Sequence, residues 1–200
     1  MRLKAGCEMT LQSSEPSALV AMLRPRSGQA QWIESESYAL EPRPEVTEYV
    51  DSYGNLCQRL VAPKGALYLR VETVAHVAEQ IATAPSAPVT PVAELPESAL
   101  LYLLPSRFCP SDKLGDKAKE IVAGRAPGYA QVEAIRRWVH AWFEAYVGGR
   151  WYTMDATQAE PRGGRLVVAY GRDAADVALF SQYGPVKSEK MKVWVEQLGT

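Results

Sequence analysis

The segment from His140 to Thr157 (HAWFEAYVGGRWYTMDAT) limits the possible folds of this chain more than any other stretch. Two adjacent glycines, Gly148 and Gly149, separate two runs that are rich in apolar and aromatic residues. Such a pair favours the two-residue turn of a β-hairpin, because both central positions of a type I′ turn require a positive φ. The sequence therefore predicts an antiparallel hairpin with its turn at these glycines.

The predicted hairpin places a histidine and an aspartate on one face. The turn sets the pairing: Val147 with Arg150, Tyr146 with Trp151, Trp142 with Asp155, and His140 with Thr157. Cross-strand partners share a face, as do residues i and i+2, so His140 and Asp155 become diagonal neighbours about 7–8 Å apart. A carboxylate beside an imidazole fixes its tautomer and stabilises its protonated form, which are two functions within a catalytic triad. The third member, a nucleophile, has to be found elsewhere in the chain.

Composition limits the classes of protein and partner. The chain has 200 residues, of which 47% are hydrophobic, so it can bury a real core in one large domain or two small ones. Its net charge is −1, and the sequence contains neither a basic stripe that would favour nucleic acid nor a polybasic segment that would favour an anionic membrane. No apolar run is long enough to span a bilayer, and the N-terminal sequence MRLKAGCEMTLQ has no secretory h-region.

The three cysteines, Cys7, Cys57 and Cys109, are odd in number and widely spaced. This usage fits a reducing compartment better than a disulfide framework, and we expect a cytoplasmic protein. The chain has two histidines and neither a CxxC nor an HExxH motif, so we expect no metal site and no other cofactor.

The first part of the chain is predicted to be an antiparallel β domain over residues 1–80. Six stretches with alternating or short apolar patterns are separated by turn residues. These stretches are 3–11, 18–23, 32–40, 46–50, 56–61 and 66–74. Residues 81–95, in which prolines alternate with Ala, Ser and Thr, are predicted to be an extended linker.

Residues 96–200 are predicted to form a second, α+β domain. Apolar stripes at helical spacing indicate helices over about 111–123 and 129–139, directly before the hairpin. A β run at 165–170 (RLVVAY) and a strand at 191–198 follow the hairpin. The predicted fold class of the chain is therefore α+β. Between these last strands, Arg172, Asp173 and Asp176 are expected to form a charged turn held by ion pairs.

Several stretches resemble bacterial transglutaminase-like proteins, whose catalytic domain has the papain-like cysteine-protease fold. YVDSYGNLCQRLVAPKGAL (49–67) resembles the β domain that precedes the catalytic domain in that family. The stretches that resemble the catalytic domain are LLPSRFCPSD (103–112), AIRRWVH (134–140), HAWFEAYVGGRWYTMDA (140–156) and VVAYGRDAADVAL (167–179). The resemblance implies cysteine-dependent acyl transfer or hydrolysis on a protein or peptide, with His140 as general base and Asp155 as its orienting acid.

One feature departs from the family pattern. In the family, the nucleophilic cysteine begins a core helix between the segments that match 131–139 and 140–147, whereas here Val139 runs directly into His140. The chain is therefore expected to be a truncated relative that lacks the segment with the catalytic cysteine. Loss of a triad member lowers rates by orders of magnitude, so we expect an inactive protein with His140 and Asp155 vestigial.

Two alternatives remain open. In the first, Cys109 is the nucleophile of an active acyltransferase, peptidase or amidase and acts with His140 and Asp155. It precedes the N-terminus of a predicted helix, and the helix dipole lowers the pKa of a thiol there. A buried structural role is nevertheless the commoner one for a free cysteine. The other alternative is a non-catalytic binding or structural protein based on the β domain.

An aromatic face accompanies the predicted site. Trp142, Tyr146 and Trp151 share the face of His140, which in the family is covered by the helix that is missing here. A large exposed apolar patch favours association. We therefore expect a homodimer through this face.

Overall fold

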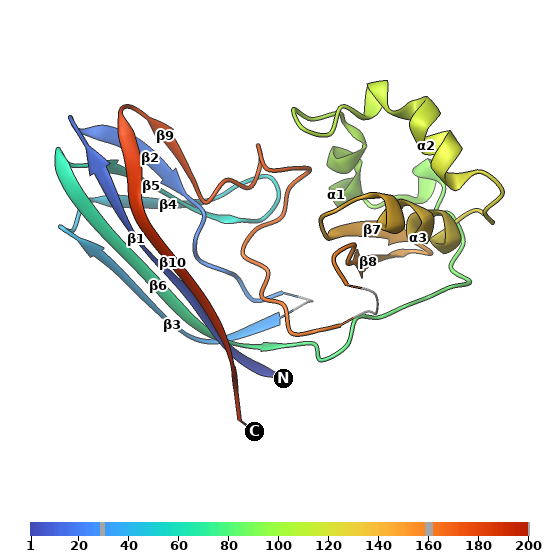
Figure 1. The fold of residues 1–200 in the computed structure, drawn as a ribbon, viewed down its shortest axis with the longest axis horizontal. Helices are drawn as coiled ribbons and strands as arrows, with labels where there is room; N and C mark the ends of the chain where they lie inside the picture. Colours follow the sequence, from blue (N-terminus) through green and yellow to red (C-terminus); the bar gives the residue numbers. More distant parts are fainter. Residues whose placement is uncertain (29–30, 159–161, 200) are drawn as a thin grey trace. The chain divides into compact units, whose positions relative to one another are not determined.

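The computed structural model describes residues 1–28, 31–158 and 162–199 (Figure 1). It is mostly β-sheet with few helices. The chain divides into two compact units. The first unit combines Met1–Ala78 with Gly164–Thr200, and the second is Glu79–Gly163.

The first unit is a β-sandwich. Its strands are β1 (Arg2–Ser13), β2 (Ser17–Ala21), β3 (Gln31–Glu41), β4 (Val46–Val50), β5 (Leu56–Ala62), β6 (Gly65–Val77), β9 (Phe180–Tyr183) and β10 (Val186–Leu198). One sheet has the order β10-β1-β6-β3 and the other has the order β4-β5-β2-β9, all antiparallel. The six strands predicted before residue 80 are all present.

The sandwich core lies between the two sheets. Successive side chains of a strand point to opposite faces, and β1 and β6 accordingly bury every second residue. Met9 and Leu69 from one sheet pack in a single cluster with Leu19 and Leu60 from the other. Burial of this apolar surface supplies most of the stability of such a unit.

The C-terminal strands belong to this first unit, which corrects the predicted second domain of 96–200. β10 pairs with β1 along its whole length, from Arg2↔Leu198 to Ser13↔Val186. β9 pairs with β2 in the other sheet. Strand pairing over such a sequence separation depends on the tertiary fold, and no local pattern indicates it.

The predicted β run at 165–170 is not a strand. Val167 N donates a hydrogen bond to Gln31 Oε1 (2.7 Å), and Gln31 Nε2 donates to Val167 O (2.7 Å). Tyr170 N donates to Asn55 Oδ1 (2.7 Å), and Asn55 Nδ2 donates to Tyr170 O (2.6 Å). Two buried side-chain amides thus satisfy backbone groups that a neighbouring strand would otherwise pair.

The charged turn predicted after this segment is confirmed. The carboxylate of Asp176 accepts hydrogen bonds from Arg172 Nε (2.8 Å), Nη2 (3.1 Å) and backbone N (3.0 Å), and from the Tyr53 hydroxyl (3.0 Å). The Arg172 side chain, more than the other donors, favours the ionised carboxyl and holds the pKa of Asp176 at about 2. The turn is thereby tied to the loop that contains Tyr53.

Substitution of Asp176 by asparagine is expected to lower the free energy of unfolding at neutral pH by about 2 kcal/mol. The folded-state pKa, about 2, lies below the ordinary value of 3.8, so this stabilisation is present above about pH 4. It is lost as the pH falls through the folded-state pKa, and the two proteins should converge there. Urea unfolding across this pH range measures the difference. Asp116→Asn, at a fully exposed ion pair, is the control and should change little at any pH.

The second unit contains the helices and a separate hairpin. Its elements are η1 (Val92–Glu94), α1 (Glu97–Leu100), η2 (Leu101–Leu103), η3 (Ser111–Lys113), α2 (Gly115–Val122), α3 (Tyr129–Trp138), β7 (Phe143–Val147) and β8 (Arg150–Met154). A small core joins α3 to one face of the hairpin through Tyr129, Val147, Tyr152 and Met154. Both helices predicted from the sequence are present, although the first begins later than predicted and follows the 3₁₀ turn η3.

The predicted linker at 81–95 is an integral part of the second unit. Ala87 packs against its core, and Ala87 O accepts a hydrogen bond from Tyr129 N (3.0 Å). Gly148 N donates to Pro88 O (2.9 Å), and Gly149 N donates to Thr90 Oγ1 (3.0 Å). The proline-rich composition therefore produces an extended segment that joins the start of α3 to the hairpin turn.

Candidate functional site

The hairpin forms in the predicted register. Gly148 and Gly149 have φ values of 59° and 81°, as a type I′ turn requires. Tyr146 pairs with Trp151, and the ladder continues to Phe143↔Met154, where it ends. The prediction of the turn and of the pairs next to it is confirmed.

His140 lies outside this ladder. Because β7 begins only at Phe143, the predicted pairs of Trp142 with Asp155 and of His140 with Thr157 are not part of the sheet. The chain leaves α3 at Trp138, and His140 is exposed in the connection that follows. Within the part of the chain that the structure describes, no hydrogen bond joins His140 to Asp155.

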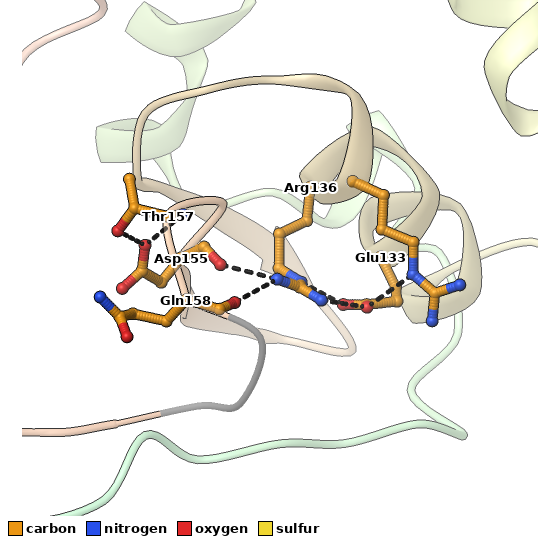
Figure 2. Close-up of polar contacts among 6 residues, drawn as sticks. Glu133, Arg136, Asp155, Thr157 and Gln158 are labelled. Atoms are coloured by element: carbon orange, nitrogen blue, oxygen red, sulfur yellow. Dashed lines mark hydrogen bonds and ion pairs between the residues drawn. The ribbon is translucent and has the colours of Figure 1, made fainter.

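Asp155 follows β8 directly and is buried. Its Oδ1 accepts hydrogen bonds from Thr157 N (2.7 Å) and from Thr157 Oγ1 (2.6 Å), as Figure 2 shows. An aspartate that binds the backbone two residues ahead forms an Asx turn. The carboxylate therefore shapes the loop after the hairpin.

Arg136 is the central polar residue of this region, and the sequence analysis did not single it out. Its Nε and Nη2 donate to the two carboxylate oxygens of Glu133 (2.8 and 2.7 Å). Its Nη1 donates to Asp155 O (2.7 Å) and to Gln158 O (3.0 Å), so the guanidinium bridges α3 and the loop (Figure 2). A signal was present: Glu133 and Arg136 have the i, i+3 spacing that brings side chains together on a helix.

The electrostatics of this bridge stabilise both charges. The Arg136 guanidinium is the main cause that holds the pKa of Glu133 below its ordinary value, and Glu133 raises the pKa of Arg136. Arg137 also donates to Glu133 (3.2 Å), but its side chain is mostly exposed. Two ionised partners held in this way are suited to orient a loop or a ligand, and not to exchange protons near neutral pH.

A pocket of about 460 Å³ lies beside this bridge. Polar lining comes from Glu133, Arg136, Arg137, Thr153 and Asp155, and apolar lining includes Tyr129 and Met154. Neither a cysteine nor a histidine is among its lining residues within the described ranges. The pocket can therefore hold a ligand with polar groups, but it presents no thiol to it.

Glu144, in β7, is a further titratable group on the hairpin. Its partner across the ladder is Thr153, whose Oγ1 lies 3.4 Å from Glu144 Oε1. Burial raises the pKa of Glu144 above its ordinary value. This face of the hairpin is thus partly desolvated.

Residues 14–78 match the family described as the bacterial transglutaminase-like N-terminal region. The whole chain matches the crystal structure of a Cytophaga hutchinsonii protein with the provisional name of a cysteine protease, at 22% identity and a TM-score of 0.86. The match covers 100% of this chain and 91% of that one. A search of curated proteins gave no match.

The family match concerns the N-terminal region alone. At this identity, the structural match establishes a shared fold alone. The stretch at 49–67 that resembles the family's β domain lies within the matched residues 14–78.

The three cysteines have different surroundings. Cys7 and Cys57 are buried in the sandwich, and burial raises the pKa of both thiols. Cys109 is exposed, which corrects the expectation that it is buried. It lies before η3, and α2 starts only at Gly115, so Cys109 is not at the N-terminus of an α-helix.

The aromatic face of the hairpin is only partly open. The Trp151 ring makes edge-to-face contacts with the rings of Tyr102 and Tyr146, at centroid distances of 5.2 and 5.3 Å. The Tyr146 hydroxyl donates to Gly149 O (2.9 Å), while Trp142 is 42% exposed. Residues from η2 therefore cover part of the face that the sequence predicts to be bare.

Within the described ranges, no cluster of three or more His, Cys, Asp or Glu side chains could hold a metal ion. Among the same residues, no helix has the length and hydropathy of a transmembrane span.

Proposed function

We propose that this chain is a transglutaminase-like protein without a working cysteine nucleophile, which binds a protein or peptide and does not process it. Members with the full triad would attack a glutamine side chain or peptide carbonyl with a thiolate. The C–N bond breaks, ammonia or an amine leaves, and the resulting thioester passes its acyl group to an amine or water. That sequence of steps requires a thiolate and an imidazole in contact.

The arrangement around Asp155 carries this proposal. The Oδ1 of Asp155 accepts hydrogen bonds from the backbone N and the Oγ1 of Thr157. His140, in contrast, is exposed and lies outside the hairpin ladder. An orienting acid has to hold the imidazole of the base, and here the carboxylate is used to form its own loop. The absence of the family's cysteine segment between Val139 and His140 in the sequence agrees with a silent site.

The pocket beside Arg136 supports binding. It combines apolar walls with polar and charged groups that could orient a ligand. The presence of all three cysteines as thiols also supports a reducing, cytoplasmic location.

The labelling rate of each cysteine by iodoacetamide, followed by mass spectrometry against pH, tests the proposal. We expect Cys7 and Cys57 to label only on unfolding, and Cys109 to label at a rate that His140→Ala and Asp155→Asn leave unchanged. His76→Ala is the control for loss of an imidazole elsewhere. Release of ammonia from a glutamine peptide should not exceed that of Cys109→Ser.

A second candidate function rests on the exposure of Cys109. An exposed thiol in the same unit as His140 would act as nucleophile in a thiol-dependent acyltransferase, peptidase or amidase. Fast labelling of Cys109 in mild acid that disappears in His140→Ala would overturn the first proposal and establish this one.

A further inference from the structure

The edge strand β10 carries an apolar stripe in its middle. β10 ends the sheet order β10-β1-β6-β3, so one side of its backbone pairs with β1 and the other side forms the sheet edge (Figure 1). Met191, Val193 and Val195 are 55%, 61% and 59% exposed. Alternate residues of a strand share a face, so these three side chains form one continuous stripe.

This stripe lies on the core face of the sheet. Met191 pairs with Met9 and Val193 pairs with Cys7, and both of these β1 residues belong to the buried core cluster. Cross-strand partners point to the same face. Val186, at the start of β10, is buried in that cluster, whereas the middle of the strand is open. The core of the sandwich thus continues into an apolar surface at this edge.

The opposite face of β10 is already occupied. Trp194 pairs with Gly6 and lies so close to it that a Cβ at Gly6 would be 2.5 Å from Trp194 Cζ2. The Arg70 guanidinium lies 5.0 Å from the Trp194 ring. Trp194 therefore packs over Gly6 of β1, and the odd-numbered side chains from Met191 to Val195 lie on the core face.

We propose that β10 pairs with β10 of a second copy of this chain in an antiparallel register centred on Val193. The proposal is independent of the function assigned to the second unit. Each sheet would then continue into the other across a two-fold axis. Such an axis makes each contact occur twice.

The sequence of β10 is self-complementary in this register. Val193 meets its own copy, and Met191 meets Val195, so the two apolar stripes lie side by side. Lys190 meets Glu196, and Lys192 meets Trp194, whose ring already lies 5.9 Å from Lys192 Nζ in the same chain. No like charges are opposed. Lysines on an edge strand usually prevent pairing with unrelated strands, and here Glu196 gives one of them a partner.

The register also avoids the irregular part of the strand. The pairing with β1 shifts between Thr10 and Leu11, opposite Lys190 and Ser188. From Lys190 to Leu198 the ladder is regular, and the proposed contact uses 190–196. An interface of one strand pair buries little surface, so we expect a weak dimer in equilibrium with the monomer. The dimer fraction should therefore rise with protein concentration.

Sedimentation velocity of the full chain over a wide range of concentration tests the proposal. The wild-type protein should pass from a 22.0 kDa monomer toward twice that mass as the concentration rises. Val193→Lys should remove this dependence, because it places two charges at the axis. Val61→Lys, at a similarly exposed valine of β5, is the matched control and should dimerise like the wild type.

Charge exchange tests the register and identifies the partner as a second copy. Lys190→Glu and Glu196→Lys should each weaken dimerisation about tenfold, because each opposes like charges at two sites. The double variant should restore the wild-type constant within about twofold. Restoration by Lys192→Glu with Glu196→Lys would overturn the register. A wild-type chain that stays monomeric, or a dimer that survives Val193→Lys and is lost in Trp142→Lys, would overturn the proposal.

Discussion

Replacing Gly128 by alanine is expected to destabilise the second unit by roughly 3–5 kcal/mol. Gly128 precedes α3 with φ 105° and ψ −137°, a conformation that side chains rarely adopt. A Cβ there would lie 2.9 Å from the carbonyl carbon of Pro88 and closer still to Ala87 O. That oxygen accepts the hydrogen bond from Tyr129 N, so it cannot withdraw without loss of the bond that starts the helix.

Urea unfolding followed by tryptophan fluorescence measures this effect, because the second unit contains Trp138, Trp142 and Trp151. Gly124→Ala separates strain from steric clash, because Gly124 also has a positive φ (69°) but no atom within 4 Å of its Cβ position. The control should lose only about 1 kcal/mol. Equal losses in the two variants would show that the approach of the 84–90 segment to α3 is not needed for stability.

Replacing Arg136 by leucine is expected to cost roughly 2–4 kcal/mol and to release the loop after the hairpin. The change removes the two hydrogen bonds to Asp155 O and Gln158 O, and it leaves Glu133 with Arg137 as its cationic partner. A hydrogen bond from a charged donor contributes more than a neutral one. Hydrogen exchange of the Thr157 amide should become faster, since the position of Asp155 depends on the bridge.

Arg137→Leu is the matched control at the next position of the helix. Its guanidinium is mostly exposed and has a single ion pair, so its loss should change the free energy of unfolding by less than about 1 kcal/mol. If both variants behave alike, Arg136 acts as a surface charge and the loop is held by Asp155 and Thr157 alone. Lysine at 136 should rescue little, because one ammonium group cannot reproduce the four hydrogen bonds.

Features set by neighbouring residues were predictable, whereas features set by distant segments were not. The turn at Gly148 and Gly149 was predictable because the required positive φ is a property of the residues themselves. The His140–Asp155 pairing was not, because it assumed that the ladder continues to the helix, whereas β7 starts at Phe143. The family resemblance could not correct this, since it implies roles without local geometry.

The sequence by itself determined the six N-terminal strands, the two helices and the hairpin register, because periodicity and turn chemistry act between near neighbours. Only the tertiary structure decided that β10 belongs to the first sheet, that 165–170 is held by Gln31 and Asn55, and that Arg136 holds the loop at Asp155. The physical reason is that these contacts join distant segments; Gln31 and Val167 are 136 positions apart. Buried backbone groups need hydrogen-bond partners, and the tertiary fold decides which side chains or strands supply them.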